Sequence, residues 1–104
     1  SYLDINVFLS ATNNGGITRG FVQIWSGSKI GRNVIVEGNV IIGNNTTIDN
    51  GAILKGNIII DDDVYIGDYC YVSSGSSIAK ECYLSHASKF WGVLMRRVYL
   101  YHYM

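Results

Sequence analysis

Charge and cysteine are both scarce in this 104-residue sequence, and each scarcity excludes a class of protein. Charged residues make up 15% of the chain, and eight lysines and arginines balance eight acidic residues, so the net charge is zero. A net charge of zero disfavours broad electrostatic binding, and we therefore expect neither nucleic acid nor a membrane as a partner. Two cysteines are too few for a disulfide framework and are compatible with the reducing cytoplasm, which is the location we expect.

Long apolar runs are also missing from the sequence. No stretch approaches the roughly 20 apolar residues that span a bilayer, and no signal-peptide pattern is present. Hydrophobic residues still make up 48% of the chain, which excludes a disordered protein and allows one domain. The chain starts at Ser1 and stops within the apolar stretch 98–104, so we expect it to be an excised part of a longer protein.

The most prominent pattern in the sequence is a six-residue repeat. Every sixth position from 24 to 90 is aliphatic or aromatic: Ile24, Ile30, Val36, Ile42, Ile48, Leu54, Ile60, Ile66, Val72, Ile78, Leu84 and Phe90. Twelve such residues in a row would arise by chance roughly once in several thousand sequences of this composition. The position two residues earlier is always small or β-branched, so each repeat predicts a short strand with two inward side chains and one outward side chain between them.

A second signal lies three residues after each of these apolar positions. The first seven such residues are Gly27, Asn33, Asn39, Asn45, Gly51, Asn57 and Asp63. Glycine, asparagine and aspartate tolerate a positive φ best, which suits a chain that turns a corner every six residues. Tyr69, Glu81 and Ala87 break this rule, so we expect altered corners or loops at these three residues.

Three six-residue sides close a triangular coil of 18 residues, so residues 18 apart are expected to stack. Ile24 would then lie on Ile42, and Ile30 on Ile48, with strands of successive coils paired in parallel at about 4.8 Å. The sequence therefore predicts an all-β fold, a parallel β-helix of about four coils.

The two ends of the chain lack the clean repeat. Three segments are expected: an N-terminal helix and linker over 1–20, the β-helix over 21–90, and an irregular strand segment over 91–104. Apolar residues at helical spacing predict the short helix within 2–10. Residues 85–91 are expected to form a loop, and residues 93–95 and 98–104 two further strands, with a helix over 93–104 as the alternative.

The outward positions carry more apolar residues than a monomer usually exposes. Ile35, Ile53 and Tyr71 form one such column, and Ile41 and Ile59 lie around the next corner. We expect this patch to be the interface of a homo-oligomer, most simply a trimer packed side to side. The alternative is that the N-terminal helix and the loop cover the patch.

Few residues have the chemistry of a catalytic base. Only His86 and His102 titrate near neutral pH. The run 61–63 consists of three aspartates, but it lies at a predicted corner with no further ligand at a matching spacing, so we predict no metal site. Arg96 and Arg97 are candidates for binding a phosphate group of a substrate.

Other polar residues are predicted to be structural. Cys70 and Cys82 fall at inward positions and are expected to be inert core thiols. Glu37 and Lys55 lie 18 residues apart and are expected to form an exposed ion pair worth less than about 1 kcal/mol.

Residues 22–84 resemble the hexapeptide-repeat proteins. The stretches that carry the resemblance are KIGRNVIVEGNVIIGNNTTIDNGAILKG and NIIIDDDVYIGDYCYVSSGSSI. This resemblance implies a left-handed coil, and it implies the trimeric assembly and the acetyl-CoA dependence that many acyltransferases of the family have. The repeat is specific for the fold and much less specific for the function.

The flanking segments resemble the C-terminal domain of bifunctional sugar-1-phosphate nucleotidyltransferases. SYLDINVFLS is similar to the helix that joins their nucleotidyltransferase domain to the β-helix, and VLMRRVYLYHYM is similar to the strand that bears their acetyl-transfer histidine. On this resemblance His102 is the base, acetyl-CoA is the cofactor, and a sugar phosphate or nucleotide sugar is the substrate. An N-terminal nucleotidyltransferase domain would precede this chain in the parent protein.

One alternative function stays open, and the sequence disfavours two others. A structural or regulatory oligomerisation domain without acyltransferase chemistry is the main one. A γ-type carbonic anhydrase requires three zinc-binding histidines, and this chain has only two. An ice-binding β-helix requires ranked threonine columns, which four scattered threonines do not supply.

Overall fold

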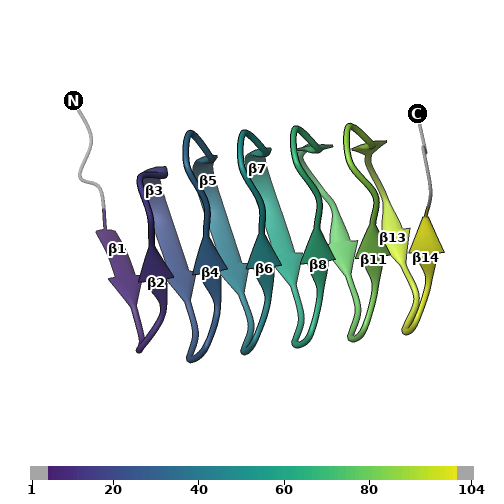
Figure 1. The fold of residues 1–104 in the computed structure, drawn as a ribbon, viewed down its shortest axis with the longest axis horizontal. Coiled ribbons are helices and arrows are strands. Elements are labelled where there is room, and N and C mark those ends of the chain that lie inside the picture. The colour runs from purple at the N-terminus through teal and green to yellow at the C-terminus, as the bar shows by residue number, and fades with distance from the viewer. Residues whose placement is uncertain (1–4, 101–104) are drawn as a thin grey trace.

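The computed structural model describes residues 5–100, which form fourteen short strands and no helix (Figure 1). The six-stranded sheet contains β2 (Thr12–Asn13), β4 (Lys29–Ile30), β6 (Thr47–Ile48), β8 (Tyr65–Ile66), β11 (Tyr83–Leu84) and β14 (Tyr99–Leu100). The eight-stranded sheet contains β1 (Ile5–Phe8), β3 (Ile17–Ile24), β5 (Ile35–Ile42), β7 (Ile53–Ile60), β9 (Tyr71–Val72), β10 (Ser77–Ile78), β12 (Lys89–Phe90) and β13 (Val93–Leu94). Every pairing between strands is parallel, which confirms the predicted all-β parallel architecture.

The chain winds as a single left-handed coil of about five turns. In Figure 1 the nearer strands β2, β4 and β6 run up the view and the farther strands β3 and β5 run down it, while the chain advances from the N-terminal to the C-terminal end. This sense of rotation is left-handed, as the hexapeptide resemblance implies. The described part measures 36 × 26 × 22 Å along its principal axes.

Residues 18 apart stack in the central turns, as the repeat predicts. Ile24 pairs with Ile42, which pairs with Ile60, and Ile30 pairs with Ile48. All five side chains are buried in one continuous hydrophobic core inside the coil. The core is therefore a column of aliphatic layers, one layer for each turn.

The turns at the two ends are shorter than those in the middle. Phe21 pairs with Ile5 and Ser77 with Val93, and both offsets are 16 residues. At the C-terminal end the connection between β12 and β13 has two residues, whereas the connection between β9 and β10 has four. The missing residues shorten the corner and keep the strands in register, so the coil continues beyond the last regular repeat.

The eight-stranded sheet covers two sides of the coil because its long strands bend at glycines. Gly38 lies within β5 with φ 116°, and Gly56 lies within β7 with φ 111°. The sequence predicts the corner at Asn39 and Asn57, but neither residue has a positive φ among those described. Each corner therefore uses the preceding glycine, and the asparagine side chain is left on the outer surface.

The predicted N-terminal helix is wrong for the described residues. Residues 5–8 form strand β1, which pairs with β3, and Phe8 packs against the core. A helix of about nine residues is marginal in water without tertiary packing, whereas a strand here gains a full parallel ladder. Residues 2–4 of the predicted helix lie outside the described residues.

The altered corners predicted at Tyr69, Glu81 and Ala87 are also absent. These residues have φ values of 58°, 62° and 61°, close to the 58° of Asn33 and the 54° of Asn45 at regular corners. The parallel ladders on either side hold the corner in the left-handed region even where the residue does not favour it. Corner geometry is therefore regular although the corner sequence is not.

The C-terminal part continues the coil. β12 (Lys89–Phe90) pairs with β9 where a loop over 85–91 is expected, and β13 covers Val93 and Leu94 as predicted for that segment. A helix over 93–104 is excluded for the residues up to 100, because β14 also lies there. Within residues 5–100 there is accordingly no helix of the length and apolar character that would cross a bilayer.

Candidate functional site

The predicted apolar patch lies on two adjacent sides of the coil. Ile35, Ile53 and Tyr71 occupy one register column of β5, β7 and β9, and Ile41 and Ile59 lie past the glycine corner of the same long strands. Ile59 is 56% exposed, Ile41 43% and Tyr71 38%, whereas Ile35 and Ile53 are half-buried by their neighbours. The structure thus brings the five residues together, and no described segment covers Ile41 or Ile59.

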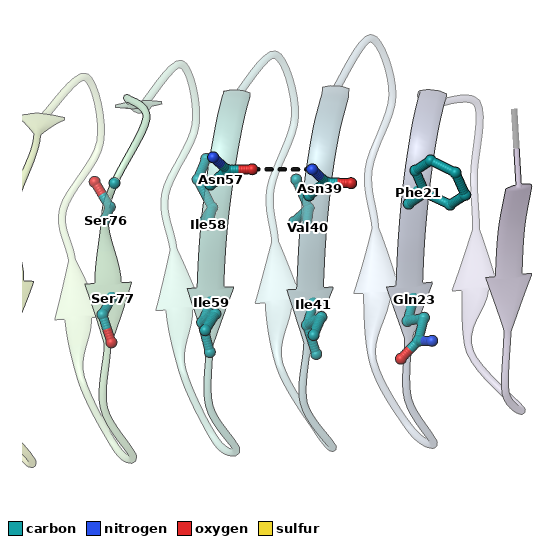
Figure 2. Close-up of a pocket in the computed structure, with 11 residues that line it drawn as sticks. Phe21, Gln23, Asn39, Val40, Ile41, Asn57, Ile58, Ile59, Ser76 and Ser77 are labelled. Carbon is teal, nitrogen blue, oxygen red and sulfur yellow. Dashed lines mark hydrogen bonds between the residues drawn. The ribbon is translucent and has the colours of Figure 1, made fainter. Parts of the chain in front are cut away.

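A shallow groove runs along this surface, parallel to the axis of the coil (Figure 2). Its floor is formed by Val40 and Ile58, which point into the core, and one wall by Ile41 and Ile59. Phe21 lies at the N-terminal end of the groove, where it is 55% exposed. The groove is therefore apolar at its base and open to solvent above.

The opposite wall of the groove is a pair of asparagine amides. Asn39 Nδ2 donates a hydrogen bond of 3.0 Å to Asn57 Oδ1, and the two side chains lie in line along the axis (Figure 2). Ser76 and Ser77 line the C-terminal end. The six-residue repeat predicts corners at these asparagines and does not predict the hydrogen bond between them, although their spacing of 18 residues places them in register.

The lining residues carry amide and hydroxyl groups but no histidine, carboxylate or amine. They can orient a ligand through hydrogen bonds and apolar contacts, but they cannot accept a proton near neutral pH. A base for any proton transfer in this groove has to come from another part of the chain or from another copy of it.

A row of charged residues borders the groove at the glycine corner. Arg19, Glu37 and Lys55 occupy consecutive register positions and line an adjoining depression with Phe21 and Asn39. The sequence predicts an ion pair between Glu37 and Lys55, but among the described residues no contact within 4 Å joins them. Glu37 and Lys55 are register partners, but their charged groups do not meet, so the predicted ion pair is wrong.

His86 lies on a different part of the surface, beside the six-stranded sheet. Its Nδ1 accepts a hydrogen bond of 2.8 Å from the backbone N–H of Asp68, and the Asp68 carboxylate lies 3.7 Å away. An imidazole that accepts at Nδ1 carries its proton on Nε2, so in this state it has no free lone pair with which to act as a base. The same arrangement, a side chain that accepts from the backbone N–H 18 residues earlier, recurs one turn earlier, where Asn50 N–H donates to Asp68 Oδ1 at 3.0 Å. His86 is therefore a residue that caps the corner of the preceding turn.

Tyr65 and Asp49 form a polar contact next to His86. The Tyr65 hydroxyl donates to Asp49 Oδ2 at 2.7 Å. This bond lowers the pKa of Asp49, while burial and the nearby carboxylate raise the pKa of Tyr65. The ring of Tyr65 stacks on Tyr83, and Tyr83 stacks on Tyr99, with centroid distances of 5.0 and 5.8 Å. The rings cover one another's faces, so the column is a structural ladder along one side of the coil.

Arg96 and Arg97 share a single partner. Their Nε atoms lie 3.2 and 2.9 Å from Glu81 Oε1. The hydrogen bond from Arg97, and next that from Arg96, lowers the pKa of Glu81. Both arginine side chains are more than 60% exposed, so the two predicted phosphate ligands lie together on the surface.

The remaining predicted site residues have structural surroundings or lie outside the described part. Asp62 Oδ1 accepts from Asn44 N–H and Asp61 Oδ1 from Asp62 N–H, which are corner contacts. Among residues 5–100 no group of three histidine, cysteine or acidic side chains is placed to hold a metal ion. His102, the candidate base, lies outside the described residues.

The two cysteines are buried in the core, as predicted. Cys70 Sγ donates to Ser85 O and Cys82 Sγ to Met95 O, both at 2.9 Å. Burial raises the pKa of the Cys70 thiol, which keeps it protonated and unreactive.

Comparison with known proteins supports the repeat and the fold. Residues 39–74 match the family described as Bacterial transferase hexapeptide (six repeats). Comparison with curated proteins gives no match.

Several solved structures share the coil. A mutant of perosamine N-acetyltransferase from Caulobacter crescentus, solved in complex with CoA and GDP-perosamine, superimposes with a TM-score of 0.82 at 18% identity over 90% of this chain. This chain spans 47% of that protein.

Two further structures are similar over most of this chain. A putative acetyltransferase from Bacillus cereus gives a TM-score of 0.62 at 16% identity, covering 93% of this chain and 69% of its own. A hexapeptide transferase family protein from Anaplasma phagocytophilum gives a TM-score of 0.58 at 16% identity, and the match covers 92% of this chain and 74% of that protein. At these identities the likeness concerns the fold alone. Residues 39–74 thus consist of hexapeptide repeats of the bacterial transferase type, set within a left-handed parallel β-helix that runs from β1 to β14.

Proposed function

We propose that this chain is the β-helix module of an acetyltransferase that uses acetyl-CoA and acts on a sugar-linked amine. The observation that carries the proposal is the groove of Figure 2, an apolar trough with an amide wall formed by Asn39 and Asn57 on an exposed face of the coil. A slender chain with amide groups fits such a trough, because its methylene groups contact the isoleucines and its amides bond to the asparagines. The acetyltransferase with the same fold was solved with CoA and a nucleotide-linked sugar, which agrees with this ligand class.

The chemistry requires a base that the groove itself does not hold. Acetyl transfer forms a bond between the acetyl carbon and the amine nitrogen and breaks the bond from the acetyl carbon to sulfur. Coenzyme A leaves as its thiolate, and the amine proton passes to the base, which can then protonate that thiolate. We assign the base to His102, because the only other histidine, His86, uses its Nδ1 lone pair to cap a corner.

The proposal includes assembly into a homotrimer. Ile41 and Ile59 remain exposed beside the groove, and a neighbouring copy packed on this face would bury them and close the trough. Such a copy could also supply polar groups to the open side of the groove.

The test is a pair of histidine variants in the full-length protein. Acetyl-CoA binding is measured by calorimetry, and acetyl transfer to amino-sugar nucleotides by mass spectrometry. His102→Ala is expected to bind acetyl-CoA like the wild type and to lose at least about 100-fold in transfer rate. His86→Ala is the matched control and is expected to keep its transfer rate. Wild-type protein that does not bind acetyl-CoA would refute the proposal.

A structural oligomerisation domain is the second candidate. The observation that favours it is the absence of any acid or base among the residues that line the groove. An oligomer that forms through the face of Ile41 and Ile59 but neither binds acetyl-CoA nor changes with His102→Ala would establish this alternative.

For the parent protein we propose a sugar-1-phosphate nucleotidyltransferase of the cytoplasm, with its catalytic domain preceding this chain. The support is the resemblance of the segment 93–104. The other flanking segment no longer supports it, because residues 5–8 form strand β1 and not the linking helix. An assay of the full-length protein for nucleotidyl transfer to sugar 1-phosphates tests the assignment, and no turnover with any such substrate would contradict it.

A further inference from the structure

Two guanidinium groups converge on one carboxylate oxygen in the last turn of the coil. Arg96 Nε and Arg97 Nε both donate to Glu81 Oε1, at 3.2 and 2.9 Å. Each guanidinium has five N–H donors, so the contact with Glu81 leaves the terminal donors of both groups available. We propose that these two guanidinium groups form a binding site for a phosphate ester or diphosphate, positioned by Glu81.

The backbone explains how two consecutive arginines come to share one side of the chain. Successive residues of an extended strand point to opposite faces. Arg97 has φ 61° because it occupies the corner before β14, and its N–H donates to Lys80 O at 2.9 Å. The turn at this corner allows the Arg97 side chain to reach the same acceptor as the Arg96 side chain.

The charge of the surrounding turn favours an anion. Residues 80–100 contain four basic residues and one acidic residue, Glu81, a net charge of +3. Residues 37–68 contain six acidic residues and one basic residue, a net charge of −5. The net charge of zero is therefore the sum of a basic C-terminal turn and acidic central turns.

Glu81 neutralises only one of the two guanidinium charges. The cluster of Arg96, Arg97 and Glu81 therefore keeps one positive charge, and its geometry is set before a ligand arrives. A phosphate group offers several oxygens to the planar donor forks of arginine, a match that makes arginine the usual residue for binding phosphate. The site does not depend on acetyl transfer, and the phosphate could belong to a nucleotide or to coenzyme A.

The test uses pyrophosphate as the probe, followed by calorimetry and by NMR shift mapping at low ionic strength. The double variant with Arg96→Gln and Arg97→Gln is expected to bind at least about tenfold more weakly, since each charge-assisted hydrogen bond contributes about this factor. Arg32→Gln removes one exposed arginine from a distant corner and is expected to change the affinity less than about twofold. Signals of residues 80, 81 and 95–98 are expected to shift in the wild type.

Four results would overturn the proposal. Three concern affinity: no pyrophosphate binding by the wild type, equal binding by the double variant, or an equal loss in the Arg32 variant. The fourth is a set of shifts confined to other residues, and this readout needs no variant to fold. Competition then identifies the source of the phosphate. Whichever of a nucleoside diphosphate and coenzyme A is the natural ligand is expected to displace pyrophosphate at the lower concentration. The acetyl-transfer proposal is tested by acetyl-CoA binding and by His102→Ala, and the phosphate-site proposal by pyrophosphate binding and the arginine variants. Each proposal can therefore fail while the other stands.

Discussion

Tyr65 illustrates how a single outward residue can stabilise the coil. Its ring stacks on Tyr83 and its hydroxyl donates to Asp49 at 2.7 Å. This hydrogen bond holds the pKa of Asp49 below its usual range. A carboxyl group whose pKa is lower in the folded state stabilises the fold above its unfolded pKa, and the contribution disappears as the pH falls through the folded pKa.

Tyr65→Phe is expected to lower the free energy of unfolding by about 0.5–1.5 kcal/mol at pH 7, because it removes a partly exposed hydrogen bond to a carboxylate. Urea denaturation over a pH series from 7 into the acid range checks the effect. The difference from the wild type is expected to shrink as the pH falls through the folded-state pKa of Asp49, which lies below its usual value. Tyr71→Phe, on another side of the coil, is the control, and a pH-independent loss at Tyr65 would contradict the role given to Asp49.

Gly38 and Gly75 provide a matched pair for the cost of a side chain at a corner. Both have a positive φ, 116° and 85°, but a Cβ at Gly38 would collide with the carbonyl oxygen of Gly56, whereas a Cβ at Gly75 would meet nothing within 4 Å. Gly75→Ala is expected to cost about 1–2 kcal/mol of unfolding free energy from backbone strain alone. Gly38→Ala is expected to cost at least about 1 kcal/mol more, because neighbouring turns would have to separate. Equal midpoints in urea would show that the close approach of the turns is unimportant.

At the scale of elements, side chains that point inward at the corners satisfy the backbone between turns. Ser28 Oγ donates to Gly43 O at 2.6 Å and accepts from Thr46 N–H at 2.9 Å. Thr46 Oγ1 repeats the pattern with Asp61 O and Val64 N–H, at 2.9 and 3.3 Å. The sequence identifies this column only as small residues, and its hydrogen bonding is a property of the stacked corners.

Thr46→Val is expected to destabilise the protein by about 1–3 kcal/mol, because it leaves the buried N–H of Val64 and the part-buried carbonyl of Asp61 without this partner while preserving the side-chain volume. Thr47→Val, at the neighbouring outward position, is the control and is expected to stay within about 0.5 kcal/mol of the wild type. Thermal unfolding of the two variants measures both effects. A similar, small change in both would mean that the corner backbone finds other partners.

The element boundaries were predictable where the repeat alone decides them. The stacking of Ile24 on Ile42 follows from period six and the triangular cross-section, and the structure confirms it. The sequence predicts the corner at Asn39, one residue after its position at Gly38, and predicts a helix where the first strand lies. Both features depend on hydrogen-bonded ladders with a neighbouring turn. Short segments with mixed patterns adopt the conformation that the adjacent turn can pair with.

At the scale of the whole molecule, the exposed isoleucines predict association. Ile41→Glu combined with Ile59→Glu is expected to convert an oligomer of wild-type protein into a monomer, because charged residues would have to be buried in the interface. Light scattering at micromolar concentration measures the mass. Met95→Glu introduces the same charge at a residue that is 71% exposed elsewhere, and it is expected to leave the mass unchanged. A monomeric wild type would contradict the predicted assembly.

The candidate site was predictable only in part. The sequence identified Ile41 and Ile59 as outward and apolar, and identified Arg96 and Arg97 as a basic pair. The spacing of 18 residues places Asn39 beside Asn57 of the next turn, but it does not predict the hydrogen bond between their amides. Nor does the sequence predict that Glu81 binds both arginines. These contacts join residues 15 to 18 positions apart whose approach depends on how the corners turn.

The sequence by itself determined the period, the inward aliphatic column and therefore the coil, because one six-residue rule repeated along the chain leaves few other ways to bury those residues. Only the tertiary structure decided the length of the coil, the secondary structure of its two ends and the hydrogen-bond partners of its outward polar groups. The reason is that buried apolar area depends on a local pattern, whereas hydrogen bonds at the surface and at the ends depend on which residues of the neighbouring turns come within reach.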